Sequence, residues 1–264
     1  MAKSGSRKAY VIITWSKIVK QIKTAAIFIY AALTVPILLA PALPLFIVSL
    51  FGMKKPVSWI VYRLAQIWGR SLIAITGCRV TVEGTEHIPR KGSVCFTCNH
   101  EGIFDIVLAL AYIGRPFGFI AKKELALIPL LNIWILILGG LFIDRKNIRK
   151  AVKTINLGIQ KIQKGGGMLI FPEGTRSKGR GLLPFRSGAI KLATNSLAPI
   201  VPVAISGSSE VFEKDFCLHS AALRLVFCPP IITADMPPDD RRHKLADEVR
   251  GIIETTLNRG EKGT

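Results

Sequence analysis

Glu83 is the first acidic residue of the 264-residue chain, so every charged side chain among the first 82 residues is a lysine or an arginine. Within this basic part, residues 24–53 form an uncharged and mostly apolar run. As one helix the run would be about 45 Å long, whereas the hydrocarbon core of a bilayer is about 30 Å thick. Such a combination is suited to a membrane surface that carries anionic lipids. We therefore expect the N-terminal part of the chain to attach to a membrane.

The net charge of +19 also raises the possibility of a nucleic-acid partner. Basic arms that bind nucleic acid are usually polar between their charges, whereas residues 24–53 are apolar. We therefore expect a membrane partner and no nucleic acid.

Three prolines bear on how this run meets the membrane. Pro36, Pro41 and Pro44 lie inside it, and a proline removes a helical hydrogen bond and clashes with the preceding turn. Lysines flank the run on both sides, and cationic flanks favour the cytoplasmic side. The pattern favours a re-entrant or half-inserted helical hairpin, with a single membrane-spanning helix as the alternative.

An amphipathic segment follows at residues 57–76. Its polar residues Arg63, Gln66 and Arg70 share one face, and aromatic residues stand among the aliphatic ones. We expect a helix at the membrane interface, with packing against the rest of the protein as the alternative. Residues 1–78 together are predicted to be a membrane-attachment segment.

Short apolar runs alternate with helical patterns from residue 79 to residue 264. The predicted strands are 80–82, 94–98, 117–120, 141–143, 168–171, 200–205 and 223–227. The predicted helices are 106–112, 148–163, 187–195 and 240–258. This alternation is typical of an α/β domain with a mixed, largely parallel sheet flanked by helices. Ligand sites in open α/β sheets lie just after the strands, so residues at strand ends are the candidates for chemistry.

Residues 125–143 are a second uncharged run. Pro129 and the pair Gly139-Gly140 divide it, so we expect a buried or membrane-hugging helix followed by a strand. The same helix is a candidate wall for a fatty chain.

The strand at 94–98 runs directly into Asn99-His100-Glu101-Gly102-Ile103-Phe104-Asp105. On one continuous helix His100 and Asp105 would be turned roughly 140° apart, so a turn must intervene if they are to meet. If Asp105 accepts a hydrogen bond from one imidazole nitrogen, the other nitrogen is left to accept a proton from a hydroxyl. A histidine that ends a strand and an aspartate that caps a helix are the plain alternative.

Three further clusters follow strands. The first ends in Asp144-Arg145, and Arg145 offers planar donors suited to phosphate, although a surface ion pair with Asp144 is the alternative. The second, Phe171-Pro172-Glu173-Gly174-Thr175-Arg176-Ser177, brings a carboxylate, a hydroxyl and a cation into one turn. There Arg176 is expected to bind phosphate while Glu173 holds Arg145 or Arg176, or accepts a hydroxyl. The third is the strand 200–205, whose Pro202 suggests an edge or a bulge.

Other kinds of chemistry find little support. The sequence has no G-x-S-x-G elbow, no phosphate-binding loop that ends in Lys-Ser or Lys-Thr, and no His/Cys cluster at metal spacing. We accordingly expect no metal. The five cysteines include Cys95 and Cys98, which we interpret as buried residues of a strand in a reduced, cytoplasm-facing compartment.

Taken in order, N-H-x-x-x-x-D, G-x-x-F-I-D-R, F-P-E-G-T-R-S and V-P-V resemble the four motifs of the glycerolipid acyltransferases, above all the 1-acylglycerol-3-phosphate acyltransferases. The resemblance covers residues 79–205. It implies that His100 is the general base and Asp105 its orienter. It also implies a role in substrate binding for eight residues: Lys122, Arg145, Glu173, Gly174, Thr175, Arg176, Val201 and Pro202.

The implied reaction is direct acyl transfer from an acyl thioester, on coenzyme A or acyl carrier protein, to the sn-2 hydroxyl of lysophosphatidic acid. The product would be phosphatidic acid, and no cofactor beyond the thioester co-substrate is expected. The chain would act at the cytoplasmic face of a membrane, the inner or plasma membrane if it is bacterial. Glu101-Gly102 departs from many relatives, which carry a polar residue and Ser there. Another lysolipid acceptor, or a non-catalytic lipid-binding protein, are the alternatives.

Overall fold

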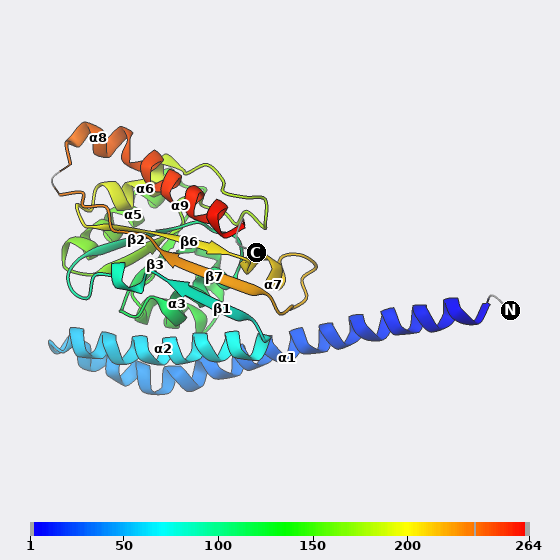
Figure 1. Ribbon diagram of the computed structural model, residues 1–264. Helices are drawn as coiled ribbons and strands as arrows, with labels where there is room; N and C mark the ends of the chain where they lie inside the picture. The colour runs from blue at the N-terminus through cyan, green and yellow to red at the C-terminus, as the bar shows by residue number, and fades with distance from the viewer. Residues whose placement is uncertain (1–2, 235, 262–264) are drawn as a thin grey trace.

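A single seven-stranded sheet forms the centre of the structure, a computed structural model that describes residues 3–234 and 236–261 (Figure 1). The strands are β1 (Arg79–Glu83), β2 (Val94–Cys98), β3 (Gly118–Lys122), β4 (Leu141–Ile143), β5 (Gly167–Ile170), β6 (Ile200–Ser206) and β7 (Ala222–Phe227). They lie in the order β1-β7-β6-β2-β5-β3-β4. Neighbours are parallel except β6 and β7, which are antiparallel. The predicted mixed, largely parallel sheet is confirmed.

Helices cover both faces of this sheet (Figure 1). One face carries α3 (Phe104–Tyr112) and α4 (Leu131–Ile137), and the other carries α5 (Ile148–Gln163), α6 (Ser187–Thr194) and α9 (Leu245–Glu261). Successive β2 side chains point to opposite faces, so Phe96 joins one buried cluster and Cys95 the other. The helix expected at 240–258 is instead two, because α8 (Pro238–His243) ends before α9 begins.

The prolines of the N-terminal run do not interrupt it. Helix α1 (Lys3–Leu50) is continuous and contains all three, so the chain turns back only after the prolines, at residues 51–53. The helix bows beneath the domain over this stretch (Figure 1), and Val35, Leu39 and Ala42 are buried there. This packing offsets the helical cost of the prolines. By length and composition, Lys17–Ser49 could cross a membrane, with a mean hydropathy of 2.3.

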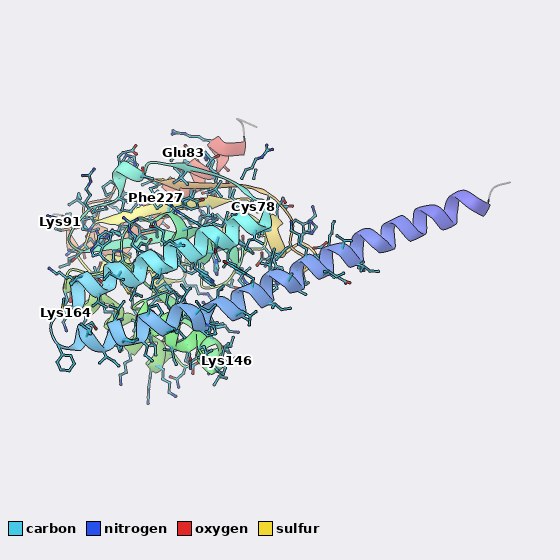
Figure 2. All side chains as sticks on the ribbon, turned by 90° about the horizontal axis from the view of Figure 1, so that it is seen from below. Cys78, Glu83, Lys91, Lys146, Lys164 and Phe227 are labelled. Atoms are coloured by element: carbon cyan, nitrogen blue, oxygen red, sulfur yellow. The ribbon has the colours of Figure 1, made fainter. Side chains whose placement is uncertain are left out.

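Helix α2 (Lys54–Thr76) turns back along α1, and the two lie side by side across the domain (Figure 2). The predicted polar face of α2 points at α3, since Gln66 Nε2 and Arg70 Nε each donate to the Ala111 carbonyl at 3.1 Å. A Cβ on Gly69 would lie 3.1 Å from the Val107 carbonyl, so a side chain at this position would crowd α3. Gln66 is therefore buried against the domain, whereas Arg63 and Arg70 are exposed, and the placement of this helix at a membrane interface stays a prediction.

The second uncharged run, residues 125–143, is half buried. Trp134 and Ile135 of α4 lie in the core, whereas Leu136 is 53% exposed and Leu127, in the short helix η2 (Lys123–Leu127), is 82% exposed. Strand β4 follows, as predicted. The run is thus an amphipathic piece of the domain.

Pro202 occupies a central strand, which corrects the expected edge or bulge. Its carbonyl accepts from Cys228 N at 2.9 Å, so its nitrogen faces the same side of β6. The β6–β7 ladder begins only at Val203, paired with Phe227. A residue with an N–H at this position could donate back to the Cys228 carbonyl, so proline forgoes one hydrogen bond, but only at the end of the β6–β7 ladder.

Candidate active site

The end of β2 delivers His100 to the edge of the sheet where the carboxyl ends of β2, β5 and β6 meet. Asn99 fixes this strand end, because its Nδ2 donates to the Ile205 carbonyl and its Oδ1 accepts from Ile205 N, both at 2.8 Å. A turn over residues 101–103 follows, and α3 begins at Phe104. The sequence predicted that a turn must lie between His100 and Asp105 if their side chains are to meet, and the structure has this turn.

Asp105 meets His100 directly across this turn. The Nδ1 atom of His100 lies 2.6 Å from Asp105 Oδ2, and Asp105 is fully buried. The same carboxylate accepts from Gly102 N at 3.0 Å and from the Ser208 hydroxyl. An acceptor-only carboxylate facing Nδ1 places the imidazole proton there and leaves the Nε2 lone pair free. Within the described part of the chain, no hydrogen bond engages Nε2.

Phe171 supports the imidazole from one side. Its ring stacks on that of His100 with centroids 4.1 Å apart and planes 18° apart. The His100 side chain is 17% exposed, so it is largely enclosed but reachable. The pair therefore has the geometry of an oriented proton acceptor that is partly exposed to solvent.

The F-P-E-G-T-R-S turn is joined to the histidine turn through backbone hydrogen bonds. Ser177 N donates to the His100 carbonyl at 2.7 Å, and Lys178 N donates to the Glu101 carbonyl at 3.0 Å. Glu173 completes the junction, since its carboxylate accepts from His100 N at 2.6 Å and from Leu183 N at 3.0 Å. Glu173 thus anchors the backbone of His100, whereas the sequence suggested that it holds Arg145 or Arg176 or accepts a hydroxyl.

Burial raises the pKa of Glu173, and the amides of His100 and Leu183 oppose that rise. Its two oxygens are therefore occupied as acceptors in a site only 2% exposed. This places Glu173 behind the site, where it shapes the turn that carries His100.

Two cations extend from this junction. Arg145 Nη1 donates to the Gly174 carbonyl, and Arg176 Nη1 contacts Glu213 Oε1 at 2.8 Å. Gly174 adopts a φ of +67°, which a side chain would strain, and Thr175 beside it is exposed. The structure brings Arg145 and the Gly174 turn together, as the sequence suggested. Asp144 pairs with Lys123 at 2.8 Å and not with Arg145.

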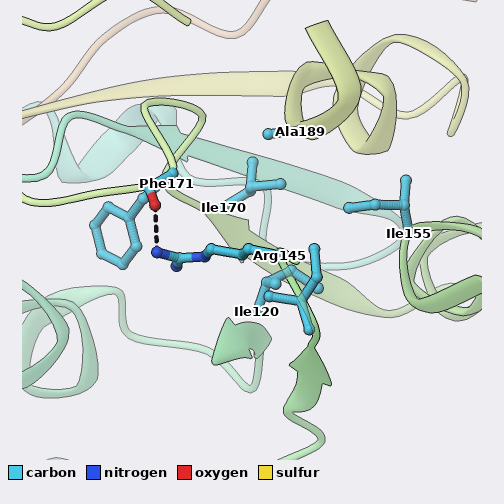
Figure 3. Close-up of a pocket in the computed structure, with 8 residues that line it drawn as sticks. Ile120, Arg145, Ile155, Ile170, Phe171 and Ala189 are labelled. Atoms are coloured by element: carbon cyan, nitrogen blue, oxygen red, sulfur yellow. Dashed lines mark hydrogen bonds between the residues drawn. The ribbon is translucent and has the colours of Figure 1, made fainter. Parts of the chain in front are cut away.

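Arg145 and Phe171 line a small cavity of about 30 Å³ (Figure 3). Its remaining walls are mostly aliphatic, formed by Ile120, Ile143, Ile155, Ile170, Gly174 and Ala189. The cavity is the size of one or two methylene groups, so it could receive only a small apolar part of a ligand. Phe171 touches both this cavity and the His100 ring.

The other predicted site residues lie further from this junction. Lys122 ends β3, is 57% exposed and lies 3.6 Å from Glu124. Val201 and Pro202 are buried in β6, where they pair in register with Phe96 and Thr97 of β2. They belong to the buried strand that lies beside the strand of His100.

Glu101 is a titrating group that the sequence did not single out. Burial and the nearby charge of Asp105 raise its pKa from 4.5 to about 7, while the backbone amides of residues 207–209 oppose the rise. Ser208 and Glu213 are further contacts that sequence reasoning missed. Ser208 begins the short helix α7 (Ser208–Phe212) and Glu213 directly follows it, and no sequence motif in this segment predicts either contact.

The strand-end His–Asp pair and the flanking arginines are the features of an acyltransferase site on an α/β domain. The family model described as Acyltransferase matches residues 79–206. The 1-acyl-sn-glycerol-3-phosphate acyltransferase of Escherichia coli is 32% identical over 80% of this chain and 84% of its own length. The enzyme of that name from Borreliella burgdorferi is 30% identical over 72% and 78%.

A probable enzyme of the same name from Mycoplasma pneumoniae is 37% identical over 74% of this chain and 76% of its own length. The crystal structure of the 1-acyl-sn-glycerophosphate acyltransferase from Thermotoga maritima superposes with a TM-score of 0.79. That comparison covers 93% of this chain and 97% of the other at 23% identity, and it shows the shared fold. The chain belongs to the 1-acyl-sn-glycerol-3-phosphate acyltransferase family.

Proposed function

We propose that this chain transfers an acyl group from a thioester to the sn-2 hydroxyl of 1-acylglycerol-3-phosphate and so forms phosphatidic acid. The observation that carries the proposal is the His100–Asp105 contact at 2.6 Å, with Nε2 left free beside the Arg145 and Arg176 turns. The printed names of the relatives support the acceptor. Coenzyme A or acyl carrier protein is the proposed carrier of the thioester.

The proposed chemistry needs one base and no covalent acyl-enzyme. Nε2 of His100 takes the proton of the acceptor hydroxyl as its oxygen attacks the thioester carbonyl carbon. The tetrahedral intermediate collapses, the C–S bond breaks, and the imidazolium returns the proton to the leaving thiolate. Buried Asp105 stabilises the imidazolium during this exchange. Arg145 and Arg176 are proposed to hold the acceptor phosphate.

We place the reaction at a membrane surface, with residues 1–78 as the attachment segment of the catalytic domain 79–264. The exposed apolar side chains of the α1–α2 hairpin favour this placement: Ile29, Leu33 and Ile37 in α1, Phe51 in the turn, and Ile67 in α2. A half-inserted hairpin facing the cytoplasm is the arrangement we propose, because lysines flank both ends of the apolar run.

The test is an acylation assay with purified full-length chain in mixed micelles. Lysophosphatidic acid and other lysolipids are offered with each thioester donor. We expect phosphatidic acid from the wild type, and a loss of at least about a hundredfold in His100→Ala because the base is gone.

His219→Ala is the matched control, because His219 also contacts an aspartate, Asp215, at 2.8 Å, but on the surface. Full activity of His100→Ala would remove the base from the proposal. A wild type that acylates another lysolipid in preference would change the acceptor.

A further inference from the structure

The family match ends at Ser206, yet the seven residues that follow contact the histidine turn at several points. The Ser208 hydroxyl donates to Asp105, and the amides of residues 207–209 face the Glu101 carboxylate. Glu213 directly follows α7 and contacts both the histidine turn and the turn that follows β5.

Glu213 joins two motifs through one oxygen. Its Oε1 accepts from Ile103 N at 2.8 Å, inside the turn between His100 and Asp105. The same oxygen contacts Arg176 Nη1 at 2.8 Å, in the turn that follows β5. The Glu213 side chain is 2% exposed and that of Arg176 is 39% exposed, so the carboxylate is buried and the guanidinium reaches from it toward the surface.

The second oxygen of this carboxylate is unusual. Within the described residues, Oε2 of Glu213 is buried without a hydrogen-bond partner. It lies 2.6 Å from where a Cβ would stand on Gly102, so the histidine turn can approach Glu213 only because residue 102 has no side chain. An incompletely paired buried carboxylate is costly, and such cost is typical of functional positions.

The segment that carries Glu213 is also braced from the N-terminal hairpin. Phe212 packs edge-on against Phe28 of α1, with ring centroids 5.4 Å apart. Leu218 N donates to Thr24 Oγ1 at 2.8 Å. The carboxylate is therefore held between the hairpin and the two turns of the site.

We propose that Glu213 is a positioning residue that fixes the turn of His100 and the guanidinium of Arg176 in one arrangement. The inference rests on the proposed function, in which His100 is the base and Arg176 binds the acceptor phosphate. Within the described residues, the side-chain hydrogen bonds of Glu213 go to Ile103 and Arg176 and not to the His100 ring. It sets the spacing between the group that takes the proton and the cation that holds the acceptor.

The test compares Glu213→Gln with Glu210→Gln in the full-length chain. Glu210 lies three residues earlier, in α7, and also forms an ion pair, with Lys214 at 3.3 Å, but on the surface. The glutamine at 213 retains an acceptor for Ile103 N and removes the charge that holds Arg176. We therefore expect the KM for lysophosphatidic acid to rise about tenfold to a hundredfold, with a smaller change in kcat.

Arg176→Ala separates positioning from general support. If Glu213 acts through Arg176, adding Glu213→Gln to Arg176→Ala should change the KM less than twofold. A purely structural role would lower the melting temperature and the active fraction and leave the KM in place. That result, or a full additional KM increase in the double variant, would overturn the inference.

Hydrogen exchange gives a readout that does not need activity. Glu213→Gln should speed amide exchange severalfold in a peptide that spans residues 174–178, where Arg176 loses its charged partner, whereas Glu210→Gln should not. Unchanged exchange in this peptide refutes the inference even if the acceptor proves to be another lipid. An inactive wild type with faster exchange in Glu213→Gln would instead refute the proposed function and leave the positioning contact standing.

Discussion

Replacing Glu101 by glutamine should change how stability depends on pH. The carboxyl is mostly buried beside Asp105, which raises its pKa from 4.5 to about 7. Between those pH values the folded protein holds a proton that the unfolded chain has released, so the free energy of unfolding falls as pH rises. The difference of 2.5 pKa units corresponds to at most about 3 kcal/mol. Glu101→Gln has no proton to lose, so this fall should disappear.

Thermal unfolding in detergent micelles from pH 4.5 to 8 measures the effect. At pH 8 the variant should melt roughly 6 to 12 °C above the wild type, and near pH 4.5 the two should melt together. Glu86→Gln is the control, because Glu86 is exposed, and it should follow the wild type throughout. Parallel curves for Glu101→Gln and the wild type would show that the Glu101 carboxylate carries no burial cost, and the argument would fail.

Two further predictions concern the hairpin. Gly69→Leu should lower the free energy of unfolding by about 1–3 kcal/mol, because a Cβ at this position already lies 3.1 Å from the Val107 carbonyl. The control is Gly251→Ala in α9, where nothing lies within 4 Å of the added Cβ, and it should raise the free energy of unfolding by up to about 1 kcal/mol. Equal effects of the two variants in thermal melts would contradict this packing. Phe51→Ala should weaken binding to vesicles that contain anionic lipid about tenfold, because this 83% exposed ring lies in the α1–α2 turn. The control is Ile232→Ala, since Ile232 is 54% exposed on the α/β domain. If Phe51→Ala sediments with the vesicles as the wild type does, the turn is not part of the membrane contact.

The strands and the strand-end motifs could be predicted from the sequence because they rest on local patterns. Apolar runs of strand length predicted β2 and β5. The first leads into the cluster that contains His100, and the second into the cluster that contains Glu173. The errors arose where tertiary contacts override local preference. Pro202 is tolerated in a central strand because it costs only one hydrogen bond, at the end of the β6–β7 ladder, and the prolines of α1 are tolerated where that helix packs on the domain. Neither partner is visible in the local sequence.

The site shows the same division between local and distant contacts. His100 and Asp105 are five residues apart, so a turn was enough to predict their meeting. Glu173 belongs to a predicted cluster, but its partner is a backbone amide, and no sequence pattern distinguishes an acceptor for an amide from one for an arginine. Glu213 lies 110 residues beyond Ile103, and only the placement of α7 after β6 brings them together. Side chains that touch substrate must follow strands and are therefore found in motifs. Those that hold the motifs in place can come from any element that packs behind them, and for such residues the fold is the first evidence.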